Sequence, residues 1–320
     1  MLYSFVKIIA RLALPIYCRD LSINRKQLLK HKGPLLLAAN HPNSFLDAII
    51  LCTLFDGTVY SLARGDAFKN KTAGKILSLF KMFPVYRVSE GVENMDENYK
   101  TFDLCKNIFS QNGIVLIFSE GRCINEWHLR PLKKGTARLA ISSWQDGIDL
   151  KVLPVAINYS SFKRFGKNIN LFFGDMITKE NIDYTDTHGN AIKQFNEILK
   201  QQLCTHVFDI EKNDKTALRK TFYIHQPVLK KIGLFIPAVF GLIVHTPLFY
   251  FTKWLGNYLI KEDGHDDSKL IAFLFIFYPV FLIIVSTVLY LLTQNLLSFL
   301  SLLILPFTAW AFVQLKKQLD

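Results

Sequence analysis

The sequence is poor in cysteine and has no cysteine pairing pattern. Its five cysteines are scattered over 320 residues, and no two of them form a C-x-x-C pair. An odd number of widely spaced cysteines argues against a secreted disulfide framework and against a structural zinc site. Reduced thiols in a cytosolic setting fit better. Because 50% of the residues are hydrophobic and 13% are aromatic, the composition also excludes a disordered chain.

Acidic residues are too few to balance the basic ones, and the imbalance lies in one part of the chain. The sequence has 38 Lys and Arg residues against 26 Asp and Glu residues, a formal charge of +12. Five residues of each sign follow residue 231, so residues 1–231 hold the other 33 basic and 21 acidic residues and carry the whole excess. Residues 1–81 alone carry 12 basic and 4 acidic residues, or +8. A basic domain of this kind could bind nucleic acid, a membrane surface or phosphorylated substrates.

The last third of the chain almost lacks charge. Three uncharged stretches follow one another, at residues 232–251, 270–293 and 296–313. A helix needs about 20 apolar residues to cross a hydrocarbon core of about 30 Å. The second stretch meets this requirement, whereas Pro237, His245 and Pro247 interrupt the first. The pattern predicts a membrane domain over 232–320 with two or three hydrophobic segments.

Basic residues beside the first apolar stretch set the expected orientation. Those that precede it are Lys215, Arg219, Lys220, Lys230 and Lys231. By the positive-inside rule they place residues 1–231 on the cytoplasmic face of the cell membrane, in a multi-pass protein. Three crossings would leave Lys316 and Lys317 outside, against the rule. Two crossings with a re-entrant or surface-lying first stretch would keep them inside, and both arrangements stay open.

The N-terminal segment, residues 1–20, lacks the small-residue cleavage site of a secretory signal. It is apolar, with Lys7 and Arg11 interspersed. Apolar residues mixed with bases are typical of an interfacial amphipathic helix that lies among lipid headgroups. A buried helix is the alternative.

Residues 21–231 alternate between short apolar runs and helical patterns. We expect strands over residues 35–39, 58–63, 114–118, 151–158 and 170–173, and helices over residues 45–55, 73–81, 93–111, 135–144 and 190–208. Strands regularly separated by helices predict an α/β fold with a mostly parallel sheet flanked by helices. In such sheets, sites form where strands end and helices begin.

His41 and Asp47 stand where the first of these strands gives way to a helix. His41 follows the strand, and Asp47 falls in the first helical turn. An Asp that keeps one imidazole nitrogen protonated leaves the other free to take a proton from a hydroxyl. Asn40 and Asn43 could orient the two side chains, and Asn43 or Ser44 is the candidate N-cap. A capped helix beside an incidental histidine is the alternative reading of His-x5-Asp alone.

A second polar group follows a later buried strand and contains Glu120, Gly121 and Arg122. Gly121 permits close backbone approach, and Arg122 offers a fork of donors to a phosphate. Arg130 and Lys133 come just before a helix whose N-terminus favours anions. Taken singly, each of these residues could equally belong to a surface salt bridge or a solvated basic face.

The order of these features carries more information than any one of them. Along the chain stand His41 and Asp47, then Pro84-Val85-Tyr86-Arg87, then Phe118-Ser119-Glu120-Gly121, and then Leu153-Pro154-Val155. Over about residues 35–174, this order resembles the glycerolipid acyltransferase superfamily, which includes the glycerol-3-phosphate and 1-acylglycerol-3-phosphate acyltransferases. The resemblance implies a glycerol-3-phosphate acyltransferase-like fold with His41 as general base and Asp47 as its orienting partner. It also implies that Arg87 and the Glu120-Gly121 loop bind the glycerol phosphate.

Two departures from the family pattern stand out. The spacing here is His-x5-Asp, where His-x4-Asp is usual, and this longer form resembles a branch with fungal glycerol-3-phosphate acyltransferases and bacterial relatives. The usual Phe-Pro-Glu-Gly-Thr-Arg reads Phe-Ser-Glu-Gly-Arg-Cys in this chain. Cys123 therefore occupies the family's arginine position and Arg122 stands one residue early, so Arg130 or Lys133 could take over phosphate contact.

These observations lead us to expect a membrane-bound acyltransferase of phospholipid biosynthesis. It would move a fatty acyl group from acyl-ACP or acyl-CoA to a hydroxyl of glycerol 3-phosphate or 1-acylglycerol 3-phosphate, with another lysolipid acceptor as the alternative. A membrane lipid hydrolase is less well supported, because the sequence has no G-x-S-x-G elbow. A non-catalytic anchor would leave His41 and Glu120 unexplained.

The expected partners follow from this reaction. They are acyl carrier protein or acyl-CoA, the glycerol 3-phosphate or lysophospholipid acceptor, and membrane lipids. The acyl donor is a co-substrate, so we expect no cofactor and no metal. We expect no nucleic acid partner either, because the sequence shows no nucleic-acid-binding motif.

Overall fold

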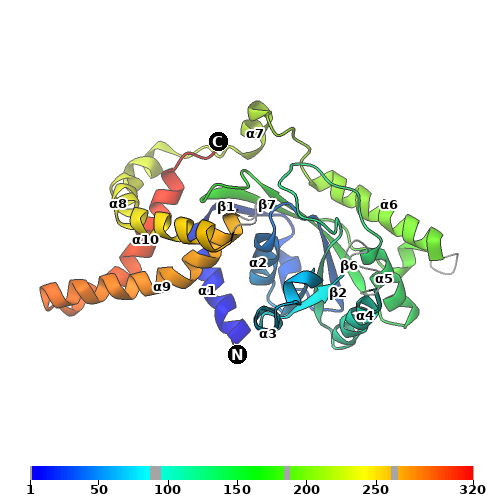
Figure 1. Ribbon diagram of the computed structural model, residues 1–320. Helices are drawn as coiled ribbons and strands as arrows, with labels where there is room; N and C mark the ends of the chain where they lie inside the picture. Colours follow the sequence, from blue (N-terminus) through cyan, green and yellow to red (C-terminus); the bar gives the residue numbers. More distant parts are fainter. Residues whose placement is uncertain (1, 87–94, 184–187, 261–265, 320) are drawn as a thin grey trace. The chain divides into compact units, whose positions relative to one another are not determined.

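The computed structural model describes residues 2–86, 95–183, 188–260 and 266–319 (Figure 1). The elements in chain order are α1 (Leu2–Tyr17), β1 (Cys18–Ile23), η1 (Lys26–Lys30), β2 (Leu35–Ala39), α2 (Phe45–Leu54), β3 (Val59–Arg64), η2 (Gly65–Phe68), α3 (Lys71–Leu79), β4 (Met82–Val85), α4 (Met95–Ser110), β5 (Ile114–Phe118), α5 (Gly135–Gln145), β6 (Lys151–Tyr159), β7 (Lys167–Phe173), η5 (Lys179–Asn181), α6 (His188–His206), α7 (Lys215–Phe222), α8 (Val228–Leu259), α9 (Asp266–Thr293), η6 (Leu296–Leu300) and α10 (Ser301–Leu315).

The strands form one sheet in the order β1-β7-β6-β2-β5-β3-β4. Strands β6, β2, β5, β3 and β4 pair in parallel. Ala39, the last residue of β2, is paired with Phe118 of β5 and with Val155 of β6. The carboxyl ends of the central strands therefore lie level with one another. This arrangement confirms the predicted α/β fold with a mostly parallel sheet flanked by helices.

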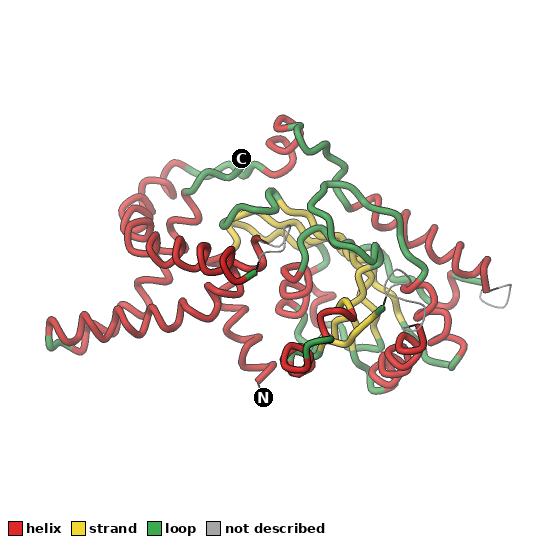
Figure 2. The backbone as a smooth tube through the Cα atoms, in the orientation of Figure 1, coloured by secondary structure: helices red, strands yellow, loops and turns green. Residues whose placement is uncertain are grey.

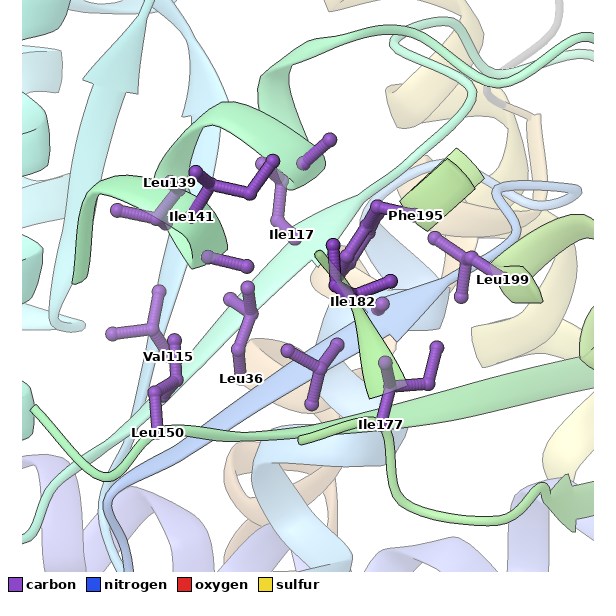
Figure 3. Close-up of a cluster of buried hydrophobic side chains, with 14 of the residues drawn as sticks. Leu36, Val115, Ile117, Leu139, Ile141, Leu150, Ile177, Ile182, Phe195 and Leu199 are labelled. Atoms are coloured by element: carbon purple, nitrogen blue, oxygen red, sulfur yellow. The ribbon is translucent and has the colours of Figure 1, made fainter. Parts of the chain in front are cut away.

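Burial of both faces explains why the central strands read as unbroken apolar runs. All five residues of β2 are fully buried. Leu36 and Ala38 point to one face, where they join Val115 and Ile117 in a core cluster closed by α4, α5 and α6. Figure 3 shows side chains of this cluster on the strands and helices that supply them. The alternate residues of β2 point to the opposite face.

The connections that follow β2 and β5 run toward opposite edges of the sheet. From β2 it passes through α2 to β3 on one side, whereas from β5 it passes through α5 to β6 on the other side. Crossovers that leave two adjacent strands in opposite directions open a crevice at the carboxyl ends of those strands. The fold thus predicts a site at the ends of β2 and β5.

Strand β1 and helix α7 are among the elements that were not expected from the sequence. Residues 18–20, placed within the N-terminal helix, instead begin β1, and α1 ends at Tyr17. The N-cap of the short helix α7 is Asp214, whose side chain accepts a hydrogen bond from the Ala217 N–H at 2.8 Å.

The chain divides into two compact units. One contains residues 1–8, 23–158 and 170–211, and the other contains residues 9–22, 159–169 and 212–320. The boundaries expected from sequence, at residues 20 and 231, and the interfacial role of α1 stay predictions.

Three helices are long and apolar enough to cross a membrane, over Val228–Leu259, Asp267–Thr293 and Leu296–Leu315. Large apolar side chains on α9 stay exposed, among them Ile276, Ile283, Ile284, Leu291 and Leu292. An exposed apolar surface of this extent is typical of membrane association.

Helix α8 is bent within its unit, as Figures 1 and 2 show. It contains Pro237 and Pro247, and proline in a helix interior causes kinks. Near its start, Lys230 bonds the Gln314 side chain of α10 at 2.8 Å. In its second half, the ring of Phe249 lies 5.9 Å from the Nζ of Lys316, which directly follows α10. Both parts of α8 therefore lie at the same end of α10.

A buried ion pair joins the start of α9 to β7. Lys167 donates to Oδ2 of Asp267, and both side chains are almost fully buried. The Tyr17 hydroxyl donates to the same oxygen at 2.7 Å. The rings of Tyr17 and Tyr159 also lie 5.8 and 5.5 Å from the Lys167 ammonium. Two phenol rings and a carboxylate thus compensate one buried charge.

Breaking this pair should destabilise the protein more than replacing it. Asp267→Leu or Lys167→Met leaves one buried charge without its opposite, which costs about 3–5 kcal/mol. The Lys167→Met/Asp267→Leu double variant leaves no unpaired charge, because both members of the ion pair are replaced. We expect each single variant to melt well below the wild type in detergent micelles, and the double variant to recover much of the loss. Single variants that melt at the wild-type temperature would contradict the role of this pair.

Candidate active site

His41 and Asp47 meet where β2 ends and α2 begins. The ring atom Nδ1 of His41 lies 2.8 Å from Oδ2 of Asp47. That oxygen also accepts the backbone N–H of Asn43 at 2.8 Å, so it acts as an acceptor and the ring nitrogen must donate. The imidazole therefore carries its proton on Nδ1, which leaves a lone pair on Nε2.

The imidazole is held in one plane by an aromatic neighbour. Its ring stacks on that of Phe118, with centroids 3.8 Å apart and planes 12° from parallel. Asp47 is fully buried, whereas the His41 side chain is 19% exposed. Within the described ranges, no group bonds Nε2 of His41. The side chain is partly exposed, and this lone pair is not taken up by any described group of the protein.

The start of α2 is shaped for this pairing. Ser44 stands at the N-cap with φ 56° and ψ −138°, a conformation that L-residues seldom adopt. Among the described residues of this turn, no backbone N–H donates a capping hydrogen bond to the Ser44 side chain. Instead the Asp47 carboxylate accepts the Asn43 N–H, so one side chain both closes the helix start and holds the imidazole.

Glu120 ties two loops together. Its Oε2 accepts the backbone N–H of His41 at 3.1 Å, and its Oε1 accepts the backbone N–H of Arg130 at 3.1 Å. The residue is buried, and burial raises the pKa of the Glu120 carboxyl, whereas the two backbone donors lower it. Glu120 thus fixes the backbone of the catalytic histidine candidate.

The loop after β5 wraps around the turn after β2. Cys123 Sγ accepts the Ser44 N–H at 2.9 Å, and Asn125 donates to the Pro42 carbonyl at 2.7 Å. Burial raises the pKa of the Cys123 thiol to about 12, so the thiol stays protonated at neutral pH. Cys123, at the family's arginine position, therefore supports the turn and brings no charge.

The Asn40 side chain forms two hydrogen bonds with the neighbouring strand, β6. Its side-chain amide donates to the Ile157 carbonyl at 3.1 Å, and its oxygen accepts the Ile157 N–H at 2.8 Å. The residue is buried. Asn40 therefore fixes the end of β2 against β6, and Asn43 is likewise buried at the turn.

Cationic side chains stand at the outer edge of the site. Arg122 and Lys133 are exposed, and within the described part of the chain neither has an ion-pair partner. Gly121 has φ +63°, and a Cβ added there would stand 3.0 Å from Cγ of Lys133. The Lys133 stem thus crosses Gly121 next to Arg122. The Arg130 guanidinium instead pairs with Glu126 at 3.0 Å.

Arg87 lies outside the described residues, but the strand that precedes it is held firmly. Asn98 of α4 bonds the backbone N–H and the carbonyl of Tyr86, each at 2.8 Å. Thr101, one helical turn later, donates to the Pro84 carbonyl at 2.8 Å.

The sequence reasoning missed three supports of the site, namely Phe118, Cys123 and Asn125. Phe118 ends a strand that pairs in register with the end of β2, so adjacency of the two strands would have indicated the stacking. No pattern in the sequence indicates the contacts of Cys123 and Asn125. Among the residues that the structure describes, no group of three His, Cys, Asp or Glu side chains could hold a metal ion.

The geometry defines the chemistry that the site can perform. A histidine with a free Nε2 lone pair and a buried carboxylate on Nδ1 can remove a proton from a hydroxyl. The Glu120 side chain holds the His41 backbone, and the Cys123 side chain holds the Ser44 backbone in the same turn.

Comparison with known protein families gives a match over the residues of this site. The model of the family described as Acyltransferase matches residues 20–158. Among curated proteins, no sequence matches this chain. A crystal structure of the 1-acyl-sn-glycerophosphate (LPA) acyltransferase PlsC from Thermotoga maritima is similar with a TM-score of 0.45 and 14% identity, covering 62% of this chain and 77% of that one. The matched segment includes His41, Asp47 and Glu120, so this part of the chain is similar to the acyltransferase family.

Proposed function

We propose that the protein transfers a fatty acyl group from acyl-ACP or acyl-CoA to a hydroxyl of glycerol 3-phosphate or 1-acylglycerol 3-phosphate. Nε2 of His41 takes the hydroxyl proton, and the acceptor oxygen attacks the thioester carbonyl. The C–S bond breaks, and the imidazolium returns the proton to the leaving thiolate. The products are an ester and a free thiol, and the reaction has no covalent enzyme intermediate.

The observation that carries this proposal is the bond of 2.8 Å between Nδ1 of His41 and the buried Asp47 carboxylate. It fixes the tautomer that a general base needs, and the carboxylate stabilises the imidazolium that forms when the proton is taken. A structural histidine would gain nothing from an exposed lone pair at the carboxyl edge of a parallel sheet.

The choice of a phosphorylated acceptor is supported by charge. Arg122 and Lys133 are exposed cations beside Gly121, on the loop that holds the His41 backbone. An arginine fork and a lysine ammonium both suit a phosphate group. Arg130 keeps a smaller role here, because Glu126 already pairs with it. Arg87 remains a candidate from the sequence.

We place the catalytic domain on the cytoplasmic face of the cell membrane. The basic residues before α8 support this orientation. The bend of α8, which brings Lys230 and Phe249 to the same end of α10, favours two crossings by α9 and α10 with a re-entrant α8. Lys316 and Lys317 then lie on the cytoplasmic side, in agreement with the positive-inside rule.

Acyl transfer can be measured directly with purified protein. We expect labelled acyl-ACP or acyl-CoA to yield an acylated lipid with glycerol 3-phosphate or its 1-acyl form, and His41→Ala to lose about 10²–10⁴-fold in kcat because the general base is gone. Lys26→Gln, an exposed substitution on η1, serves as the control. Turnover by His41→Ala at the wild-type rate would refute the role of the imidazole.

Asp47→Asn tests the orienting carboxylate separately. The amide can still accept the Asn43 N–H, but it no longer compensates the imidazolium charge. We expect kcat to fall by about 10²–10⁴-fold, with the acceptor KM nearly unchanged and the melting temperature preserved. A variant with normal kcat would contradict the pairing.

The Arg122→Gln/Lys133→Gln double variant tests acceptor recognition. Because hydrogen bonds to a charged group contribute about 1.5–3 kcal/mol each, we expect the KM for a phosphate-bearing acceptor to rise at least about tenfold. The matched control, Lys26→Gln/Lys30→Gln, removes the same charge before β2 and should leave KM unchanged. Equal KM values in both variants would exclude Arg122 and Lys133 from the phosphate site.

A further inference from the structure

Arg19 in β1 is a buried cation, and none of the residues that the structure describes gives it a carboxylate partner. The residue is only 6% exposed. Its Nε donates to the Gln314 carbonyl at 3.3 Å, and its Nη2 donates to the Lys316 carbonyl. Nη1 is also buried, and no acceptor for it exists in the described part of the chain. A buried charged donor without an acceptor costs free energy, and a bound anion would remove that cost.

The surroundings of Arg19 add positive charge. Burial, followed by the neighbouring Arg164 charge, lowers the pKa of Arg19 to about 10, while Tyr223 raises it. The guanidinium is therefore still charged at neutral pH. Gln314, which donates to the Arg19 carbonyl at 3.0 Å, also accepts from the Lys230 ammonium at 2.8 Å. Three cations thus surround a small group of backbone and amide acceptors.

The C-terminal tail brings a further cation to this place. Arg164 Nη1 donates to the Lys317 carbonyl at 3.4 Å. The Lys317 side chain is exposed, and no interaction of its ammonium is found among the described residues. All of these residues belong to one compact unit, so their arrangement is internal to it.

The position of this cluster indicates the kind of anion. It lies where α8 begins at Val228 and where α10 ends at Leu315. Lysines and arginines at the ends of apolar helices reach the level of the lipid headgroups. Anionic phospholipids carry a phosphate group at that level, and their negative charge attracts basic side chains near the membrane surface.

We propose that Arg19, Arg164 and Lys317 form a binding site for a phosphate group, supplied by the headgroup of an anionic phospholipid. The free Nη1 of Arg19 donates to a phosphate oxygen, and Arg164 and Lys317 share the remaining negative charge. Such a lipid would hold the tail and β1 at the base of the membrane helices. The proposal uses none of the residues assigned to acyl transfer and does not rest on that function.

The test measures the melting temperature of the full chain in detergent micelles during titration with short-chain phosphatidylglycerol, short-chain phosphatidylcholine or inorganic phosphate. We expect phosphatidylglycerol to raise the melting temperature saturably. Arg19→Lys keeps the positive charge but loses the Nη1 donor, so it should weaken the apparent affinity for phosphatidylglycerol at least about tenfold. This ligand is not a substrate of the proposed reaction, so a failure of this site is distinguishable from a failure of acyl transfer.

A second variant guards against loss of folding in Arg19→Lys. Lys317→Gln changes an exposed ammonium and should weaken the affinity several-fold, whereas Lys26→Gln on η1 removes the same charge and should not. If inorganic phosphate stabilises the protein equally and in the same variants, the site is supported with free phosphate as its source. Equal stabilisation by phosphatidylcholine, no stabilisation by any probe, or unchanged affinity in Arg19→Lys and Lys317→Gln would overturn the proposal.

Discussion

The candidate active site depends on one carboxylate oxygen. Oδ2 of Asp47 accepts both the ring N–H of His41 and the backbone N–H of Asn43, so the same atom closes the start of helix α2 and sets the tautomer of the His41 imidazole. Full burial of Asp47 excludes water from these bonds and strengthens them. The parallel sheet contributes by bringing the ends of β2 and β5 level, which places Phe118 and Glu120 beside the histidine.

Much of this fold could be predicted because parallel strands buried on both faces leave a clear signal. Leu35–Ala39 and Ile114–Phe118 are apolar runs bounded by polar residues, and both are strands with the expected bounds. The strand order is not encoded in any single run, so the sequence could not show that β5 lies beside β2. Strand β1 was missed because Cys18–Ile23 alternates apolar and polar residues only weakly and follows directly on a helix.

The site was predictable in its chemistry and less so in its supports. The spacing of His41 and Asp47 and the helix start allowed their contact, the family resemblance implied it, and the structure shows it. Roles that depend on tertiary neighbours were not visible: Asn40 is used by the backbone of Ile157, and Glu120 by the backbones of His41 and Arg130. These side chains are polar residues at strand ends, as substrate ligands are, and only the structure distinguishes a support from a ligand. Arg122 and Lys133 remain the exposed candidates for substrate.

The double attachment of Glu120 has a mechanical consequence. The two oxygens of Glu120 bond the backbones of His41 and Arg130, so a shift of either segment moves the other or breaks a hydrogen bond. A shift of the backbone at Arg130 would therefore be transmitted through Glu120 to the backbone of His41. The alignment of the His41 imidazole is thus coupled to the position of the loop at Arg130, ten residues beyond Glu120.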